Sequence, residues 1–279
     1  MRVRPGDVRR SEWVIFSFLV YAAVLAALLP VSNSVRYRVI ILNTALILTY
    51  AFLVPLFSNA TSLALSITRD AISMVLVILA YREMGWFAQP HLNQNLESSW
   101  VIWDRAVLRG GGRAAIEVLG PLLPSLLEIS YALVYTLAPF GIVMLYVYGH
   151  RERVDRFLFI FAVGVLLCYA QFPFWPSEPP RVVFRTEDFP YDTVFRRFNL
   201  WMLGNYGIHT SVFPSAHVAG AFVTAIGAWR TLPEHQWVSR LLLVMAILIA
   251  IATVYGRYHY LADAAAGIVM AVVAFLITI

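Results

Sequence analysis

Long apolar stretches alternate with polar segments along almost the whole chain. A membrane-spanning helix needs about 20 mainly apolar residues, and about eight stretches approach that length. These stretches cover residues 13–29, 39–57, 63–81, 122–148, 157–174, 215–230, 241–254 and 261–279. The pattern therefore predicts an all-α fold, a polytopic transmembrane helical bundle of about eight spans.

The third stretch is unusual because it contains adjacent opposite charges, Arg69 and Asp70. Charged side chains within a membrane span are costly and usually face the interior of the helix bundle. The same pair would lie at the membrane–water interface if the span began further along the chain. The sequence leaves both placements open.

Two longer polar segments interrupt the apolar pattern. Residues 82–120 mix charged and amide side chains with tryptophans, which favour the membrane–water boundary, so we expect an interfacial segment along one face. Its three consecutive glycines, 110–112, predict a flexible break, because they lack the strand–loop–helix setting and the lysine of a phosphate-binding loop. Residues 175–213 are expected to form a long polar loop.

The composition supports a membrane protein. The 279 residues are 60% hydrophobic and only 13% charged, with a mean hydropathy of +0.72, whereas soluble domains carry about 25% charged residues. All 21 basic residues are arginine, and the formal net charge is +5. Arginine suits bidentate phosphate contacts, although genomic base composition explains the same bias. Cys168 is the single cysteine, which excludes an intrachain disulfide. We expect a membrane lipid and not a nucleic acid as the partner.

His259 and Asp263 stand four residues apart where the last apolar stretch begins. On a helix this spacing places both side chains on one face. A carboxylate that accepts a hydrogen bond from one imidazole nitrogen leaves a lone pair on the other, which makes the histidine a nucleophile or a base. A purely structural pair of histidine and carboxylate has the same spacing.

A second set of polar residues, including Ser215 and His217, lies where the sixth apolar stretch begins, in the run PSAH at 214–217. Proline and serine are typical of a helix start. The free backbone amides at such a start attract anions. An ordinary capped helix would show the same residues.

Two arginines accompany these helix starts. Arg181 follows two prolines, a stiff element that would aim its side chain reproducibly, and Arg257 stands in the turn before the last stretch. The alternative is arginines that contact lipid headgroups. Two histidines, a carboxylate, two arginines and a helix start supply what phosphoryl transfer needs: a nucleophile, a proton donor and fixed positive charge. No metal or cofactor is expected, because the sequence shows no obvious cluster of metal ligands.

The arginines also suggest an orientation in the membrane. Arg9 and Arg10 precede the first span, and three more arginines crowd residues 149–156. With an even number of spans both segments share one side, which the positive-inside rule makes cytoplasmic. The candidate site, at 175–213 and 255–260, then faces the non-cytoplasmic side of a plasma (inner) membrane. The loop 175–213 also carries arginines, so the charge count alone does not decide the orientation.

The motifs resemble those of the type 2 phosphatidic acid phosphatase superfamily over residues 170–270. The matched positions are Pro214, Ser215 and His217 for the family's PSxH motif and His259, Asp263 and Gly267 for its third motif. The resemblance implies a six-span catalytic core. It also implies that His259 forms a phosphohistidine, that Asp263 orients it, and that His217 protonates the leaving oxygen.

Departures from the family pattern point to one branch. The arginine that usually stands six residues before the nucleophilic histidine is replaced by Thr253, and Arg257 is the available substitute. The first motif usually has a lysine ahead of Arg-Pro, whereas this chain has no lysine and the order Pro-Pro-Arg, ending at Arg181. These features are similar to the inositol phosphorylceramide synthases and their bacterial relatives. The phosphate would be bound by Arg181, Arg257 and Ser215.

The expected function is phosphoryl transfer on a membrane lipid phosphate or phospholipid headgroup, with a lipid hydroxyl or water as acceptor. The Pro-Pro-Arg order favours a phospho-headgroup transferase. A lipid phosphate phosphatase, acting on phosphatidic acid or polyprenyl phosphate, is the close alternative, and a catalytically inactive lipid-binding or lipid-moving protein is the remote one. We expect an N-terminal transmembrane hairpin at 1–60 and a catalytic membrane domain at 61–279; the oligomeric state is not indicated.

Overall fold

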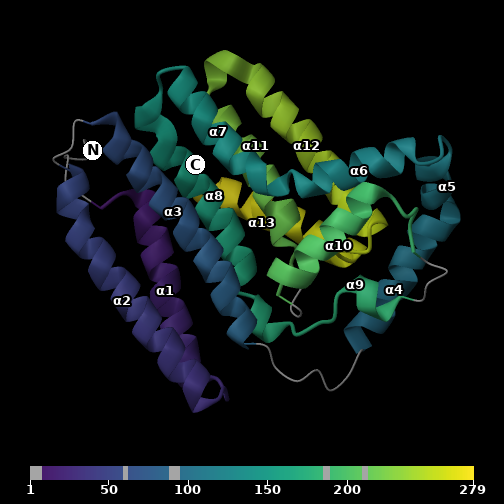
Figure 1. Ribbon diagram of the computed structural model, residues 1–279, viewed down its shortest axis with the longest axis horizontal. Coiled ribbons are helices and arrows are strands. Elements are labelled where there is room, and N and C mark those ends of the chain that lie inside the picture. The colour runs from purple at the N-terminus through teal and green to yellow at the C-terminus, as the bar shows by residue number, and fades with distance from the viewer. Residues whose placement is uncertain (1–7, 59–61, 88–94, 185–188, 209–212) are drawn as a thin grey trace.

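The computed structural model of the protein describes residues 8–58, 62–87, 95–184, 189–208 and 213–279. These residues form helices joined by short connections and contain no strand, which confirms the all-α prediction (Figure 1). Short 3-10 helices occur at Gly85–Phe87, Arg151–Arg153, Phe172–Phe174 and Pro233–His235.

Seven of the predicted apolar stretches correspond to single α-helices. They are α1 (Arg10–Leu28), α2 (Asn33–Ser58), α3 (Leu63–Met84), α8 (Val154–Tyr169), α11 (Ala216–Thr231), α12 (Gln236–Tyr255) and α13 (Leu261–Ile277). Within the described part of the chain, five helices are long and apolar enough to cross a membrane, or six if a pair bent by 105° forms one span. The chain is therefore a helical membrane protein.

The fourth apolar stretch, 122–148, forms two helices where the sequence predicts one. They are α6 (Leu122–Ala132) and α7 (Val134–Val147). At their joint the Leu133 carbonyl accepts both the amide and the hydroxyl of Thr136, at 2.9 and 2.7 Å. These bonds close a tight turn in place of the regular α-helical pattern, so the chain changes direction within the apolar stretch.

The segment 82–120 also forms helices, and one of its faces packs into the bundle. They are α4 (Asn95–Val107), a π-helical turn (Leu108–Gly112) and α5 (Arg113–Glu117). Gly111 adopts a φ of +118°, so the predicted break at the triple glycine is a kink that glycine permits. Trp100 is buried and stacks on Phe213, whereas Trp103 is exposed. The interfacial prediction therefore fits only the outer face of this segment.

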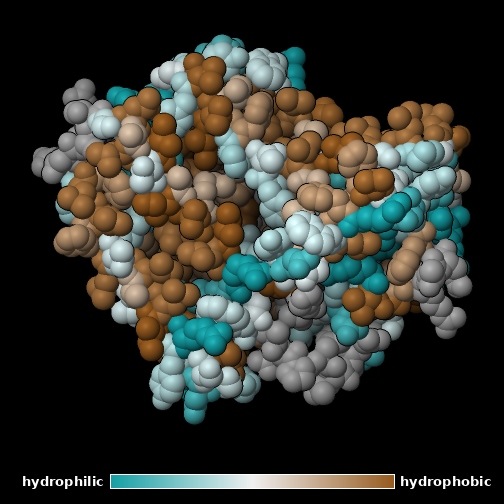
Figure 2. Space-filling model, viewed as in Figure 1, coloured by the Kyte–Doolittle hydropathy of each residue, from teal (hydrophilic) through white to brown (hydrophobic). Residues whose placement is uncertain are grey.

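The expected loop 175–213 contains two helices that the apolar pattern does not predict. They are α9 (Pro180–Val183) and α10 (Val194–Tyr206). Thr193 caps α10, because its Oγ1 accepts the Arg196 amide at 3.0 Å. One side of α10 packs on α6. Its outer side mixes exposed aromatic and polar residues, and Figure 2 shows hydrophilic and hydrophobic side chains side by side over this part of the face. The mixture has no regular apolar period, which explains why the segment resembles a loop in the sequence.

The middle of the bundle is formed by α8 and α11, which approach each other closely at small residues. A Cβ on Gly164 would lie 2.4 Å from Val223, and one on Gly227 would lie 2.9 Å from Phe157. Larger side chains at these positions would push the helices apart. In a membrane such close van der Waals packing is a main source of helix association. Because α11 also contacts α7, α12 and α13, its N-terminal end is held firmly.

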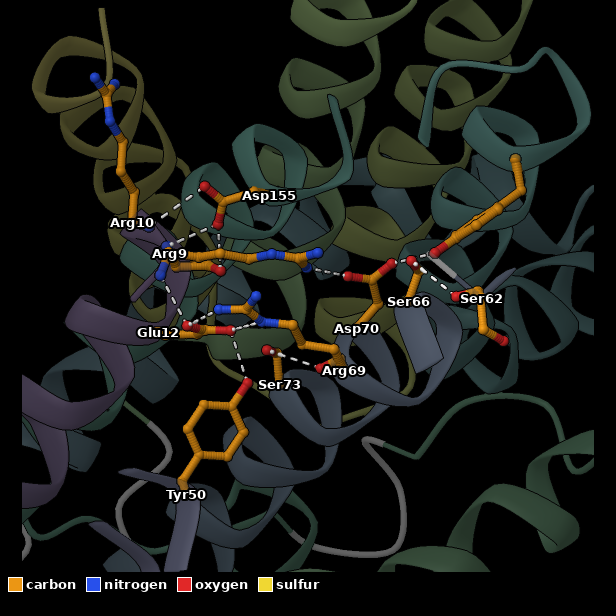
Figure 3. Close-up of polar contacts among 12 residues, drawn as sticks. Arg9, Arg10, Glu12, Tyr50, Ser62, Ser66, Arg69, Asp70, Ser73 and Asp155 are labelled. Atoms are coloured by element: carbon orange, nitrogen blue, oxygen red, sulfur yellow. Dashed lines mark hydrogen bonds and ion pairs between the residues drawn. The ribbon is translucent and has the colours of Figure 1, made fainter. Parts of the chain in front are cut away.

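Buried charges on α1 and α3 form a paired network at one end of the bundle (Figure 3). Arg69 donates two hydrogen bonds to Glu12, at 2.6 and 2.8 Å. Asp70 accepts hydrogen bonds from Arg9 and from Tyr146. Arg69 and Asp70 are therefore buried and face the bundle interior.

This network end lies opposite the end that carries the predicted histidines. Tyr146, at the C-terminal end of α7, belongs to the network, whereas the first turn of α7 contacts His217. Arg10 of α1 and Ile277 of α13 line the same shallow groove, so both ends of the described chain meet at the network end. The expectation that the N-terminal segment and residues 149–156 share one side is consistent with this arrangement, because the Ser11 hydroxyl donates to Asp155 at 2.6 Å.

Candidate active site

The turn that carries His259 has a strained backbone. Arg257 has a φ of +62°, a left-handed conformation that costs a residue with a side chain about 1–2 kcal/mol. The Thr253 carbonyl accepts the amides of Tyr258 and His259, at 2.9 and 3.0 Å. These bonds end α12 and fix the direction in which the following residues leave it.

Asp263 holds the imidazole of His259 at the start of α13. Its Oδ2 lies 3.3 Å from His259 Nδ1 and accepts the Tyr260 amide at 2.9 Å. Both side chains are buried. The carboxylate thus makes Nδ1 the hydrogen-bond donor and leaves the lone pair of His259 on Nε2.

The start of α11 is joined to the start of α13. The Ser215 amide donates to the Asp263 carbonyl at 3.0 Å, and Ser215 Oγ caps α11 by accepting the Val218 amide at 3.3 Å. Gly267 permits this approach, because a Cβ there would lie 2.5 Å from the Ser215 carbonyl oxygen. Ser215 is therefore buried between the two helices and holds them together.

This joint brings the two predicted histidines into contact. His217 Nδ1 lies 3.2 Å from His259 Nε2, across a separation of 42 residues in the chain. His217, His259 and Asp263 thus form one continuous series of hydrogen bonds.

Arg181 is the predicted arginine that reaches the histidines. Its amide donates to the Arg257 carbonyl at 3.1 Å, which docks α9 on the catalytic turn. Its guanidinium lines a cavity together with His217 and His259, and no carboxylate in the described ranges pairs with it. Burial lowers the pKa of the Arg181 guanidinium. A partly desolvated cation of this kind favours an anionic ligand as its counter-charge.

Arg257, in contrast, points to a carboxylate behind the turn. Its Nη1 lies 3.4 Å from Asp104 Oδ2, and its guanidinium lies over the Phe184 ring, 3.9 Å from the centroid. Asp104, on α4, also accepts the Leu261 amide at 2.8 Å. The sequence does not identify Asp104, because its contact with Arg257 spans 153 residues.

A second buried cluster supports the same turn from α6 and α10. Glu128 accepts hydrogen bonds from Arg196 at 3.4 Å and Asn199 at 2.7 Å, and a further one from Tyr258. Arg196 also donates to the Gly256 carbonyl at 2.7 Å. The sequence offers no motif that marks these residues, because their partners lie on helices far apart in the chain.

The histidines and Arg181 lie at the polar end of a largely apolar cavity of about 210 Å³. Its apolar walls come mainly from α3, α7 and α8, through Met74, Val77, Ile78, Val134, Ala138, Phe161 and Val165. The residues from α3 recur three and four positions apart, so they form one face of that helix. A polar end with apolar walls fits an amphiphilic ligand that has an anionic head.

The family to which these motifs belong is shown by comparison with known proteins. A model described as the PAP2 superfamily matches residues 117–277, more than half of the chain. The chain belongs to the PAP2 superfamily. The matched segment contains α6 to α13 and both histidines, whereas α1 to α4 precede it. The predicted resemblance is confirmed at the level of the superfamily.

A relative supports the same family. A PA-phosphatase related-family protein of Dictyostelium discoideum is 47% identical over 51 residues, which are 18% of this chain and 9% of that protein. The chain therefore matches less than a tenth of that relative's length. No solved structure matches the chain. Membership of the PAP2 superfamily indicates a phosphatase-type enzyme for phosphoryl transfer on lipids.

Proposed function

We propose that this PAP2-superfamily protein moves a phospho-headgroup between membrane lipids through a phosphohistidine at His259. The observation that carries the proposal is the hydrogen-bonded series of His217, His259 and Asp263 beside Arg181, at the polar end of a largely apolar cavity. The Pro-Pro-Arg order and the lack of lysine support an enzyme similar to the inositol phosphorylceramide synthases.

The first step is nucleophilic attack by His259. Its Nε2 lone pair forms a bond to phosphorus while the bond from phosphorus to the leaving lipid oxygen breaks. That oxygen takes a proton from His217 in its imidazolium form, which becomes neutral. Asp263 stabilises the positive charge that develops on the His259 ring. In the second step an acceptor hydroxyl oxygen forms a bond to phosphorus while the bond from phosphorus to His259 Nε2 breaks. The hydroxyl gives its proton to neutral His217, which restores the enzyme.

The two imidazoles must separate before this chemistry can occur. The 3.2 Å between His217 Nδ1 and His259 Nε2 leaves no room for a phosphorus atom and its leaving oxygen. Substrate binding would therefore replace the direct hydrogen bond by contacts that pass through the phosphoryl group.

Positive charge for the phosphoryl oxygens would come from Arg181 and from the start of α11. The guanidinium fork suits two phosphate oxygens at once, and Ala216 places the positive end of the α11 dipole at the cavity. Ser215 and Arg257 would support this arrangement from behind, through the Asp263 carbonyl and the Asp104 carboxylate. In this proposal no metal ion or cofactor takes part.

The proposal includes an arrangement in the membrane. Eight crossings, of which α7, α11 and α13 are the shorter ones, would include a six-span catalytic core. The network end would lie on the cytoplasmic side of the inner membrane, since Arg151 and Arg153 lie there, and the cavity would open on the other side. Residues 1–60 would form an N-terminal hairpin, and residues 61–279 the catalytic domain.

The experiment that tests the function follows the phosphorus. Purified protein is given a phospholipid with a radioactive headgroup phosphate, with and without a lipid alcohol. Label on the lipid alcohol would establish the transferase, and soluble phosphate released in both reactions would establish a lipid phosphate phosphatase. If folded protein moved no label at all, a lipid-binding protein without catalysis would remain. His259→Ala is the control that must move no label.

A further inference from the structure

The joint between α6 and α7 places two tyrosines against His217. The ring of Tyr131, in the last turn of α6, lies 5.5 Å from the imidazole, centroid to centroid. Tyr135, in the first turn of α7, meets the imidazole edge-on at 5.6 Å and 87°. Its hydroxyl lies 3.0 Å from His217 Nε2. The series of hydrogen bonds in the active site therefore extends to Tyr135.

The direction of each hydrogen bond in this series follows from the carboxylate at its far end. Asp263 accepts, so Nδ1 of His259 carries a hydrogen and Nε2 of His259 is an acceptor. Nδ1 of His217 must then be the donor to that acceptor, which leaves Nε2 of His217 without a hydrogen when the ring is neutral. The Tyr135 hydroxyl consequently donates to Nε2.

We propose that Tyr135 is the positioning residue of His217, as Asp263 is of His259. When His217 is protonated to the imidazolium for catalysis, the Tyr135 oxygen accepts from its Nε2–H, which directs the Nδ1 hydrogen towards the leaving oxygen and leaves a neutral ring after the transfer. This inference rests on the proposed function, in which His217 is the proton donor, and it adds a residue that the family motifs do not contain.

The two positioning groups differ in the way their histidines require. A carboxylate makes the neutral imidazole more nucleophilic and stabilises the positive charge that develops on the ring once it has reacted. A phenol hydroxyl is neutral and can either donate or accept a hydrogen bond. Tyr135 can therefore hold His217 both before and after the proton is transferred, without making that imidazole a stronger base.

The tautomer of His217 tests the proposal without any substrate. Nitrogen NMR of protein labelled at histidine is expected to show His217 protonated at Nδ1 and not at Nε2. In Tyr135→Phe the hydrogen should redistribute between the two nitrogens, while the His259 signals keep their pattern. A wild-type His217 protonated at Nε2 would overturn the proposal even if the variant did not fold, and so would an unchanged tautomer in Tyr135→Phe.

Kinetics supply the second measurement. Tyr135→Phe should lower kcat about tenfold on a lipid phosphate with a poor leaving group, as expected for the loss of one orienting hydrogen bond. It should hardly affect an activated phenyl phosphate, whose leaving group needs no proton, and KM should stay unchanged. Equal losses on both substrates would contradict the positioning role.

A matched control lies near the other end of the same helix. Tyr148, just after α7, accepts a hydrogen bond from Trp237 at 3.2 Å, far from the cavity. Tyr148→Phe makes the same chemical change and should alter neither the His217 tautomer nor the kinetics. If the wild-type protein turned over neither substrate, the proposed function would fail, whereas the NMR result would still decide the role of Tyr135.

Discussion

Both ends of the bundle contain buried charged side chains, but the ends differ in whether every charge has a partner within the protein. At the network end Arg69 pairs with Glu12, and Asp70 accepts from Arg9 (Figure 3). Asp70 also accepts from Tyr146. At the cavity end, Arg181 lines the cavity without a carboxylate partner in the part of the chain that the structure describes. Charged side chains that pair with each other hold helices together, whereas a charged side chain without a partner in the protein can bind a ligand of opposite charge.

The same distinction separates the two arginines that the sequence predicts as phosphate ligands. Arg257 is buried and pairs with Asp104, so it resembles the arginines of the network end. Arg181 faces the cavity beside the histidines. The comparison can therefore be tested by removing one charge at a time and measuring activity and stability separately.

Removing the nucleophile should have the largest effect. His259→Ala should reduce turnover to the detection limit, because the variant lacks the Nε2 atom that forms the phosphoryl intermediate in the proposed mechanism. The wild type should accumulate an acid-labile, base-stable phosphoryl adduct during turnover, and the variant should form none. An adduct of equal yield in His259→Ala would show that the nucleophile lies elsewhere.

Removing Arg181 should affect activity much more than stability. Arg181→Ala should lower kcat about 10²–10³-fold, equivalent to about 2.7–4 kcal/mol, as for the loss of a group that binds developing negative charge. The unfolding midpoint in detergent should stay within the error of the wild type. Arg181→Lys should recover only part of the rate, because lysine lacks the bidentate fork. Full recovery would mean that charge alone matters.

How much of this could be predicted from the sequence depends on the range of each interaction. The helices that are long and apolar enough to cross a membrane could be predicted, because an apolar stretch of that length is a local property of the chain. The histidine motifs could also be located, because Ser215 marks a helix start and the four-residue spacing of His259 and Asp263 places them on one face. Helix α10 could not, because its irregular mixture of polar and aromatic residues suggests a loop.

The partners of the buried charges are invisible in the sequence for a different reason. Asp104 meets Arg257 across 153 residues, and Glu128 meets Arg196 across 68. No local pattern encodes such a contact, so the sequence does not show that Arg257 and Arg196 have carboxylate partners. Tyr135 is hidden in the same way, since a tyrosine in an apolar stretch is typical of a lipid-facing or core position.

Breaking the network end should affect stability much more than activity. Arg69→Met leaves Glu12 as a buried charge, which should destabilise the fold by about 3–4 kcal/mol. Turnover per folded molecule should stay within about twofold, since the network lies opposite the cavity. The double variant Glu12→Gln/Arg69→Met should recover most of the stability. Arg113→Met is the control, because the pair of Arg113 with Glu117 is partly exposed and worth about 0.5 kcal/mol.

The pair of Arg257 and Asp104 should behave like the network end although it lies beside the active site. Arg257→Leu should destabilise the fold by about 3 kcal/mol, because Asp104 remains buried and unpaired. The double variant Asp104→Asn/Arg257→Leu should recover stability and most of the activity. If stability returned and activity did not, Arg257 would bind the phosphate directly.

The smallest predicted effect concerns the apolar part of the cavity. Met74 lies seven residues before Tyr81 on the cavity face of α3, a rise of about 10 Å along the helix axis towards the network end. A lipid chain that extends from the polar end would reach Met74, so Met74→Trp should shorten the space available to it. We expect kcat/KM for a long-chain lipid phosphate to fall about tenfold, the size of effect that one poorly accommodated hydrophobic group produces. A short-chain, water-soluble phosphate should be unaffected, because its head contacts only the polar end.

Val75→Trp is the matched control, since Val75 adjoins Met74 on the same helix but is exposed on the outer face. Equal losses on long and short substrates in Met74→Trp would show that the substitution disturbs the site itself and that α3 does not select the chain.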